Sequence, residues 1–229
     1  MQLKKMMIAG ILLFTTLAVA QEPPVLNTDK DKLNYGIGVG VVRNFQRQGV
    51  DIDLEMVIAG MRDTFSGKKL LLTEEQLQTI MTAFQKDLIQ KQTEAAKARA
   101  EKNKKEGEPF LADNSKKEGV VTLPSGLQYK ILKDGDGKKP TIDDTVTCNY
   151  RGTLIDGTEF DSSYKRNQPA TFALKSVIKG WGEALQLMPV GSKWQLFVPS
   201  NLAYGEASAG PQIGANATLI FEVELLSVK

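Results

Sequence analysis

The spacing of apolar residues changes part-way along the chain, and this change restricts the fold more than any other feature. From Asp29 to about Lys105, apolar side chains recur every three or four residues, which is typical of amphipathic helices. From about Val120 they alternate with polar residues, which is typical of half-buried strands. The sequence therefore predicts an α+β chain, with an all-helical front region followed by a sheet-rich region.

Three helices are predicted in the front region, separated at Gly49 and Gly67. Their apolar faces consist of Leu33, Ile37, Val41 and Phe45; of Leu54, Val57, Ile58, Met61 and Phe65; and of Leu77, Ile80, Met81, Phe84 and Leu88. The third helix begins with a capping-box pattern at Thr73 and Gln76. Beyond about Gln90 it lacks large apolar residues, so residues 91 to 116 are predicted to form a solvated linker, with Gly107 and Pro109 ending or bending the helix.

The apolar faces of residues 21 to 90 allow two interpretations. They pack as the ordinary core of one chain, or two chains share them. A helical region of about 60 residues is marginal for a core of its own, which favours a homodimer. Gly36 and Gly40, four residues apart, are interpreted as a site of close helix packing, because the local Gly-Ile-Gly-Val-Gly order does not match a phosphate-binding loop.

The β-rich region covers residues 117 to 229. Its clearest alternating runs are Leu127, Tyr129 and Ile131; Val146, Cys148 and Tyr150; and Leu219, Phe221, Val223 and Leu225. A turn signal at Asp156-Gly157 joins two strands, and one helical insert presents Ile178, Trp181, Leu185 and Met188 on one face. We expect a mostly antiparallel sheet wrapped on one short helix.

Residues 1 to 20 have the pattern of a secretory signal peptide. Lys4 and Lys5 precede an apolar stretch that ends in Ala18-Val19-Ala20, and this stretch is too short to span a bilayer. We expect cleavage after Ala20, no transmembrane anchor afterwards, and a location in the periplasm or at the outer membrane or cell surface. Cleavage removes two lysines, which leaves 27 basic against 27 acidic residues, so no global attraction to nucleic acid is expected.

Two absences narrow the chemistry. The chain contains no histidine, which excludes a Ser-His-Asp hydrolase and a histidine-based metal site. Cys148 is the single cysteine, so no intrachain disulfide forms, and its place in an alternating run predicts a buried apolar role. No cofactor and no metal are expected.

Four motifs in the β-rich region resemble those of the FKBP-type peptidyl-prolyl cis-trans isomerases, in the same order and with similar spacing. They are Asp156-Gly157-Thr158-Glu159-Phe160-Asp161-Ser162-Ser163, Val177-Ile178-Lys179-Gly180-Trp181, Leu202-Ala203-Tyr204-Gly205 and Ala217-Thr218-Leu219-Ile220-Phe221-Glu222-Val223-Glu224-Leu225-Leu226. With its helical front region, nearly the whole chain is similar to the macrophage infectivity potentiator (Mip) proteins of Gram-negative bacteria. The segment Leu123-Pro124-Ser125-Gly126-Leu127-Gln128-Tyr129-Lys130 contributes to this similarity.

The resemblance implies an isomerase that needs no cofactor and acts on proline-containing peptides and proteins. Asp161 at the cavity edge and the Tyr204 hydroxyl are its catalytic candidates, and the Ile178 backbone N–H is a further donor to substrate. The apolar walls are assigned to Tyr150, Phe160, Phe172, Val177, Ile178, Trp181, Ile213 and Phe221, with the proline ring on Trp181. From pattern alone, alternating aromatic residues are more often core, and Asp161 has an alternative role as a structural carboxylate bonded to a tyrosine or to backbone.

Two departures from the family pattern affect ligand preference. Ala170 stands where many relatives have an aromatic residue, so one wall is either open or formed by Phe172 instead. The loop after Tyr204 lacks bulky residues and leaves Ile213 as its single apolar candidate. Macrolide inhibitors are therefore candidate ligands whose affinity the sequence does not fix.

Two other functions remain at this point. A dimer with long arms is also suited to hold unfolded envelope proteins, with isomerisation secondary, because two tethered sites raise the effective concentration of a client. The fold alone is also compatible with an inactive adhesion scaffold. The complete set of motif residues argues against the scaffold.

Overall fold

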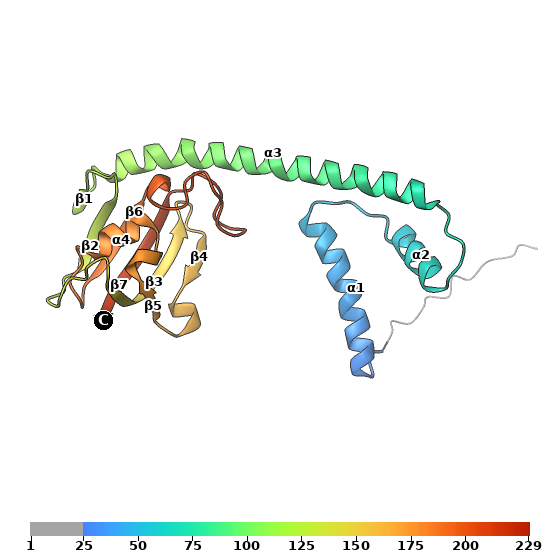
Figure 1. Ribbon diagram of the computed structural model, residues 1–229, viewed down its shortest axis with the longest axis horizontal. Coiled ribbons are helices and arrows are strands. Elements are labelled where there is room, and N and C mark those ends of the chain that lie inside the picture. Colours follow the sequence, from blue (N-terminus) through green and yellow to red (C-terminus); the bar gives the residue numbers. More distant parts are fainter. Residues whose placement is uncertain (1–24) are drawn as a thin grey trace, which may run out of the picture. The chain divides into compact units, whose positions relative to one another are not determined.

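The computed structural model describes residues 25–229, and all helices and strands named in the following paragraphs lie in this range (Figure 1). The predicted signal peptide at residues 1 to 20 lies outside the described residues. The chain divides between Thr73 and Glu74 into two units. Within the described residues, no helix combines the length and the apolar character needed to cross a membrane.

The first unit contains helices α1 (Asp29–Arg47) and α2 (Leu54–Phe65). Thr28 caps α1 in a reciprocal capping box with Asp31, and Asp53 caps α2 by accepting a hydrogen bond from the N–H of Met56. Both helices end shortly before the predicted glycines, Gly49 and Gly67, which adopt φ angles of +66° and +65°. The sequence therefore placed these helices correctly.

Neither helix of the first unit has a buried residue within this chain. Phe65 is 97% exposed, and Leu33, Ile37 and Met61 are each more than half exposed. Within the first unit, therefore, α1 and α2 form no packed core of their own, and the single-chain core and the core shared by two chains both stay predictions. The packing expected at Gly36 and Gly40 is also absent within the described chain, because a Cβ at either position would meet nothing within 4 Å.

The second unit begins with α3 (Glu74–Asn114), a helix of 41 residues, and continues into an antiparallel sheet. The strands are β1 (Val120–Thr122), β2 (Gln128–Lys133), β3 (Thr145–Leu154), β4 (Glu159–Ser162), β5 (Ala170–Ala173), β6 (Lys193–Val198) and β7 (Leu219–Val228). Their order is β1-β2-β6-β7-β3-β4, and β5 also pairs with β3. The short helices are α4 (Lys179–Leu185) and the 3-10 turns η1 (Tyr164–Arg166), η2 (Leu174–Ser176) and η3 (Ser200–Leu202).

The core lies between the concave face of the sheet and α4, as the sequence predicted. Trp181, Ala184 and Leu185 of α4 are at most 4% exposed and pack with inward residues of β3, β6 and β7. Cys148 is fully buried in this core, and burial raises the pKa of its thiol to about 12. It is therefore the inert apolar side chain that its position in the sequence indicated.

The predicted end of α3 near Gly107 and Pro109 is wrong, because the helix continues through both residues to Asn114. Its C-terminal part packs against the sheet (Figure 1), where Phe110 lies 6.1 Å from Phe197 between ring centroids. Gly107 permits this approach, since a Cβ there would come within 2.5 Å of the Thr218 hydroxyl. Tertiary contact thus outweighs the low helix propensity of glycine and proline.

Strand β2 shows the same influence of α3. The alternating pattern suggested that Tyr129 and Ile131 face inward, yet Ile131 is 44% exposed while Gln128 is 4% exposed. The Gln128 side chain accepts a hydrogen bond from Asn114 and donates one to the Leu111 carbonyl, both at 2.9 Å. The helix therefore covers the face of β2 that the pattern assigned to solvent.

Candidate active site

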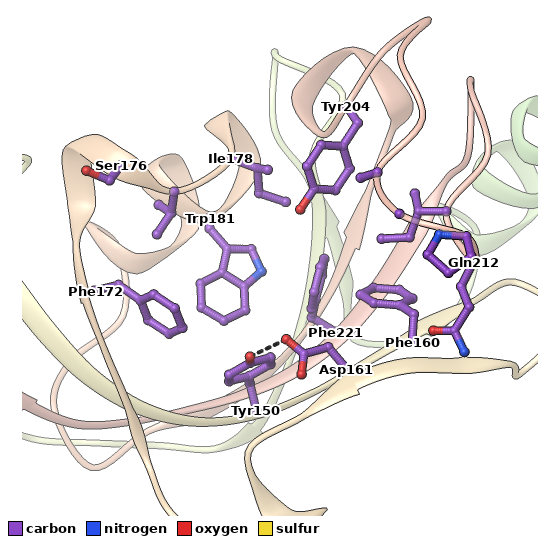
Figure 2. Close-up of a pocket in the computed structure, with 15 residues that line it drawn as sticks. Tyr150, Phe160, Asp161, Phe172, Ser176, Ile178, Trp181, Tyr204, Gln212 and Phe221 are labelled. Carbon is purple, nitrogen blue, oxygen red and sulfur yellow. Dashed lines mark hydrogen bonds between the residues drawn. The ribbon is translucent and has the colours of Figure 1, made fainter. Parts of the chain in front are cut away.

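A pocket of about 490 Å³ opens on the side of the sheet covered by α4 (Figure 2). All ten residues selected from the sequence line it, although they come from β3, β4, β5, β7, α4 and the connecting segments. The full lining consists of Tyr150, Phe160, Asp161, Phe172, Ser176, Val177, Ile178, Trp181, Tyr204, Ala209, Gly210, Pro211, Gln212, Ile213 and Phe221. The fold therefore brings together residues that are up to 71 positions apart, from Tyr150 to Phe221.

Trp181 forms the base of this pocket and is surrounded by aromatic rings. Its ring centroid lies 5.3 Å from Tyr150, 5.6 Å from Phe172 and 5.2 Å from Phe221, each in an edge-to-face arrangement. Within residues 25–229, the buried indole N–H finds no hydrogen-bond acceptor. The base of the pocket is therefore formed by aromatic rings with one unpaired N–H, and the carboxylate of Asp161 and the hydroxyl of Tyr204 lie at its edge.

An irregularity in the sheet places two neighbouring residues of β4 in the same pocket. Successive side chains of a strand normally point to opposite faces. Between Gly152 and Thr153 the pairing of β3 with β4 shifts, so Phe160 has no partner in the register. Such a bulge redirects side chains, and both Phe160 and Asp161 line the pocket.

Asp161 is held in a hydrogen-bonded network at the pocket edge. Its carboxylate accepts hydrogen bonds from the Tyr150 hydroxyl (Figure 2), from Arg166 and from the Ser162 backbone N–H at 2.8 Å. Arg166 also donates to the Tyr150 hydroxyl at 2.8 Å. Sequence reasoning missed Arg166, which lies in the short turn η1 where no periodic pattern marks it.

This network keeps Asp161 ionised. Burial tends to raise the pKa of Asp161, but the hydrogen bonds from Tyr150 and Arg166 outweigh it, so this pKa lies below its ordinary value. The pKa of Tyr150 is raised by burial and by its bond to Asp161, so its phenol stays protonated. Asp161 therefore presents a fixed negative charge and has no free donor with which to protonate a substrate.

Besides the Trp181 indole N–H, two donors near the pocket have no partner among residues 25–229. Figure 2 shows the Tyr204 ring at the rim with its hydroxyl directed into the pocket, and this hydroxyl makes no hydrogen bond with residues 25–229. The backbone N–H of Ile178, the residue before α4, also donates to no acceptor in that range. Both donors are therefore free to bind an acceptor atom of a ligand in the pocket.

The comparisons with known proteins agree with this geometry. Residues 136–226 match the family model described as FKBP-type peptidyl-prolyl cis-trans isomerase, and residues 30–131 match the domain amino terminal to it. The chain is 52% identical over 229 residues to the "Outer membrane protein MIP" of Legionella longbeachae, covering 100% of this chain and 98% of the relative. The chain belongs to the FKBP-type peptidyl-prolyl cis-trans isomerase family.

Two further relatives of this FKBP-type isomerase support the assignment over the whole chain. The chain is 48% identical to the "Peptidyl-prolyl cis-trans isomerase Mip" of Coxiella burnetii, over 96% of this chain and 94% of that protein. The crystal structure of FkpA from Escherichia coli matches with a TM-score of 0.65 and 36% identity, covering 90% of this chain and 99% of that one. These names favour isomerisation over a primary holdase function or an inactive scaffold.

At the two positions where the sequence departs from the FKBP-type pattern, other residues line the pocket. Ala170 pairs with Cys148 in the sheet and lies outside the pocket, whereas Phe172 lines the pocket 5.8 Å from Tyr150 between ring centroids. Phe172 therefore forms this wall. Ile213 is not the single apolar contact of the loop after Tyr204, because Ala209 and Pro211 also line the pocket.

Trp194, the second tryptophan, lies outside the pocket. Its ring stacks on Tyr129 with 4.3 Å between the centroids and an interplanar angle of 14°. It is 4% exposed on β6. Residues 25–229 also contain no group of three or more His, Cys, Asp or Glu side chains placed to hold a metal ion.

Proposed function

We propose that this FKBP-type isomerase accelerates rotation about X-Pro bonds in exported proteins by favouring the twisted amide in its aromatic pocket. The observation that carries the proposal is the cluster of aromatic rings around Trp181 at the base of the pocket. Such a pocket distinguishes two geometries of one bond rather than two chemical species.

The physical basis is the change in amide polarity during rotation. The rotation barrier of an amide bond is about 18–20 kcal/mol, and the cis and trans forms of an X-Pro bond differ by only about 0.5–1 kcal/mol. Twisting removes the resonance, so the carbonyl oxygen carries less charge and loses less hydration when it enters an apolar pocket. The pocket therefore binds the transition state more strongly than the planar ground state.

The residues of the pocket divide the work between packing and orientation. The proline ring rests on Trp181, and the unpaired donors of Ile178 and Tyr204 bind substrate carbonyls on either side. Asp161 holds a fixed negative charge beside the twisting bond, where it makes polar contacts without transferring a proton. Catalysis then requires no nucleophile and no cofactor.

A proline-isomerisation assay with a short X-Pro peptide tests this function. We expect turnover by the full mature chain and, after Asp161→Ala, a loss of roughly tenfold or more in kcat/KM, because one hydrogen bond to a charged group contributes about 1.5–3 kcal/mol. Lys97→Ala on the exposed surface of α3 is the matched control. An inactive parent would refute the isomerase function, and a fully active, folded Asp161→Ala variant would refute the role of Asp161.

We also propose a homodimer formed through residues 21 to 90 and joined to the isomerase region by a linker over residues 91 to 116, which contains the C-terminal part of α3. The first unit leaves its apolar residues exposed: Phe65 is 97% exposed, Leu71 is 82% exposed and Met56 is 62% exposed. Ile80 and Ile89 in the first part of α3 are also more than half exposed. Apolar surface of this extent in a soluble chain is typical of an interface, and a second copy carries the matching surface.

We also propose that the chain is exported and that its pocket accepts ligands other than proline-containing proteins. The signal pattern of residues 1 to 20 and the relative named "Outer membrane protein MIP" support a location in the bacterial envelope. Proline-containing envelope proteins are then the natural clients. Macrolide inhibitors are proposed as competing ligands, because the cavity of about 490 Å³ is in the range of pockets that hold drug-sized molecules.

A further inference from the structure

One wall of the pocket is a loop rather than a strand or helix. Between η3 and β7 the chain folds back on itself, with the Ala209 N–H donating to the Ile213 carbonyl at 2.9 Å and the Asn216 N–H donating to the Gly205 carbonyl at 2.7 Å. Residues 209 to 213 of this loop line the pocket. Because loops of this kind have few contacts of their own, something else must fix the wall for it to bind substrate in one conformation.

Two side chains of α3 hold this loop. Arg99 donates to the Pro211 carbonyl at 3.0 Å and, through its second terminal nitrogen, to the Gln212 carbonyl. Asn103, one helical turn further on, donates to the Ala215 carbonyl at 2.8 Å. Three loop carbonyls are therefore bound by one face of a helix that precedes them by more than a hundred residues.

Gly214 lets the loop approach these side chains closely. A Cβ at this position would lie 2.8 Å from Nε of Arg99, 2.9 Å from its Cδ and 3.1 Å from Nδ2 of Asn103. Any larger residue would push the guanidinium away from the carbonyls. The contact therefore depends on three residues, Arg99, Asn103 and Gly214, which we call the loop clamp.

We propose that the loop clamp positions the substrate-binding wall, so that α3 contributes to the affinity for the residues flanking proline. This inference rests on the isomerase function of the pocket. The planar guanidinium binds two carbonyls at once, which restricts the loop more than a single donor does. Restricting the loop before binding lowers the entropy lost when substrate binds.

The loop clamp acts on binding rather than on bond rotation. Figure 2 shows Gln212 of the clamped wall on the side of the pocket away from Trp181. We therefore expect this wall to contact the residues that flank proline in the planar and the twisted state alike. A group that binds both states equally changes KM and leaves kcat unaltered. Arg99 and Asn103 are therefore positioning residues, and loosening the loop should appear in KM.

Steady-state isomerisation kinetics of the full mature chain test the loop clamp, with Arg99→Ala, Arg99→Lys and Gly214→Ala compared with the parent. We expect Arg99→Ala to raise KM by roughly 3- to 10-fold with kcat within about 2-fold, since a net hydrogen bond corresponds to about that factor. The KM of Arg99→Lys should lie between those of the parent and Arg99→Ala, because the lysine ammonium binds one carbonyl where the guanidinium binds two. Gly214→Ala should raise KM by a similar factor to Arg99→Ala, although it changes the loop side of the contact rather than the helix side. Lys97→Ala, two residues away on another face of α3, is the matched control.

Amide hydrogen exchange of Ala209, Gly210, Gln212 and Ile213, the pocket-lining loop residues that carry a backbone N–H, gives a second measurement that does not depend on activity. Faster exchange in Arg99→Ala with an unchanged melting temperature is the expected result. An active parent with unaltered KM and unaltered loop exchange in Arg99→Ala would overturn the loop clamp, as would an equal effect of Lys97→Ala. An inactive parent would instead refute the isomerase function, and with it any role of the clamp in substrate binding, even if the loop exchange changed.

Discussion

Two tyrosine hydroxyls in the same pocket differ in their hydrogen bonding, and we predict that their replacement has different effects. The Tyr150 hydroxyl is engaged within the chain, since it donates to Asp161 and accepts from Arg166 at 2.8 Å. Tyr150 is 5% exposed, whereas Tyr204 is 42% exposed and its hydroxyl has no partner among residues 25–229. Replacing each by phenylalanine removes one oxygen atom, so the two variants form a matched pair.

The expected magnitudes follow from these contacts. Tyr150→Phe removes two hydrogen bonds, for which the net cost is about 1–2 kcal/mol. For a chain of this size that corresponds to a fall of roughly 2–8 °C in the melting temperature. Tyr204→Phe removes no intramolecular bond, so its melting temperature should stay within about 1 °C of the parent value. If the hydroxyl binds a substrate carbonyl, however, kcat/KM should fall by roughly 2- to 12-fold.

Differential scanning calorimetry and the isomerisation assay, applied to both variants, separate the two roles. A Tyr204→Phe variant with parental kcat/KM would refute the assignment of Tyr204 as a donor to substrate. A Tyr150→Phe variant that melts with the parent would show that the Asp161 network adds nothing to stability. In that case the low pKa of Asp161 would also need another cause.

The remaining predictions concern acid stability and assembly. Since the folded pKa of Asp161 lies below its unfolded value of about 3.9, its charge stabilises the fold above about pH 4 and this contribution disappears as the pH falls through the folded pKa. In urea unfolding, the difference in stability between the parent and Asp161→Asn should therefore narrow below about pH 4; a constant difference down to about pH 2 would contradict the assigned shift. For assembly, Gly40→Leu should convert a dimer to monomers in analytical ultracentrifugation, whereas Gly38→Leu, on the opposite face of α1, should not, although a Cβ at either position meets nothing within 4 Å in one chain. Equal behaviour of the two leucine variants would remove the Gly36 and Gly40 face from the proposed interface.

The sequence predicted those parts of the fold that depend on local periodicity. The three helices of the front region and the strands around Cys148 and Phe221 each carry a clear pattern of apolar residues. The pocket residues were found because they belong to family motifs, since alternating aromatic residues alone indicate a core. Ten residues selected in this way line one pocket.

Features that depend on contacts between distant segments were not predictable from these patterns. The continuation of α3 past Pro109 and the burial of Gln128 both result from the packing of α3 on the sheet. Arg99 lies on a surface of α3 for which the sequence pattern predicts exposure to solvent. Its hydrogen-bond partners are backbone carbonyls 112 and 113 residues away, which a local pattern does not indicate. Every residue has a backbone carbonyl, so residue types do not indicate which carbonyls bind a side chain. A charged residue that binds backbone carbonyls therefore has the same sequence pattern as one that faces water.

In the proposed mechanism, the apolar environment accelerates bond rotation, and no proton moves in the rate-limiting step. A solvent isotope comparison tests it most directly: kcat/KM of the full mature chain is measured in H₂O and in D₂O at matched pH and pD. The chain supplies no histidine, and Asp161 is held ionised, so we expect a ratio close to one. A clear slowing in D₂O that disappears in Asp161→Ala would mean that Asp161 takes part in proton transfer, and it would contradict the proposed mechanism.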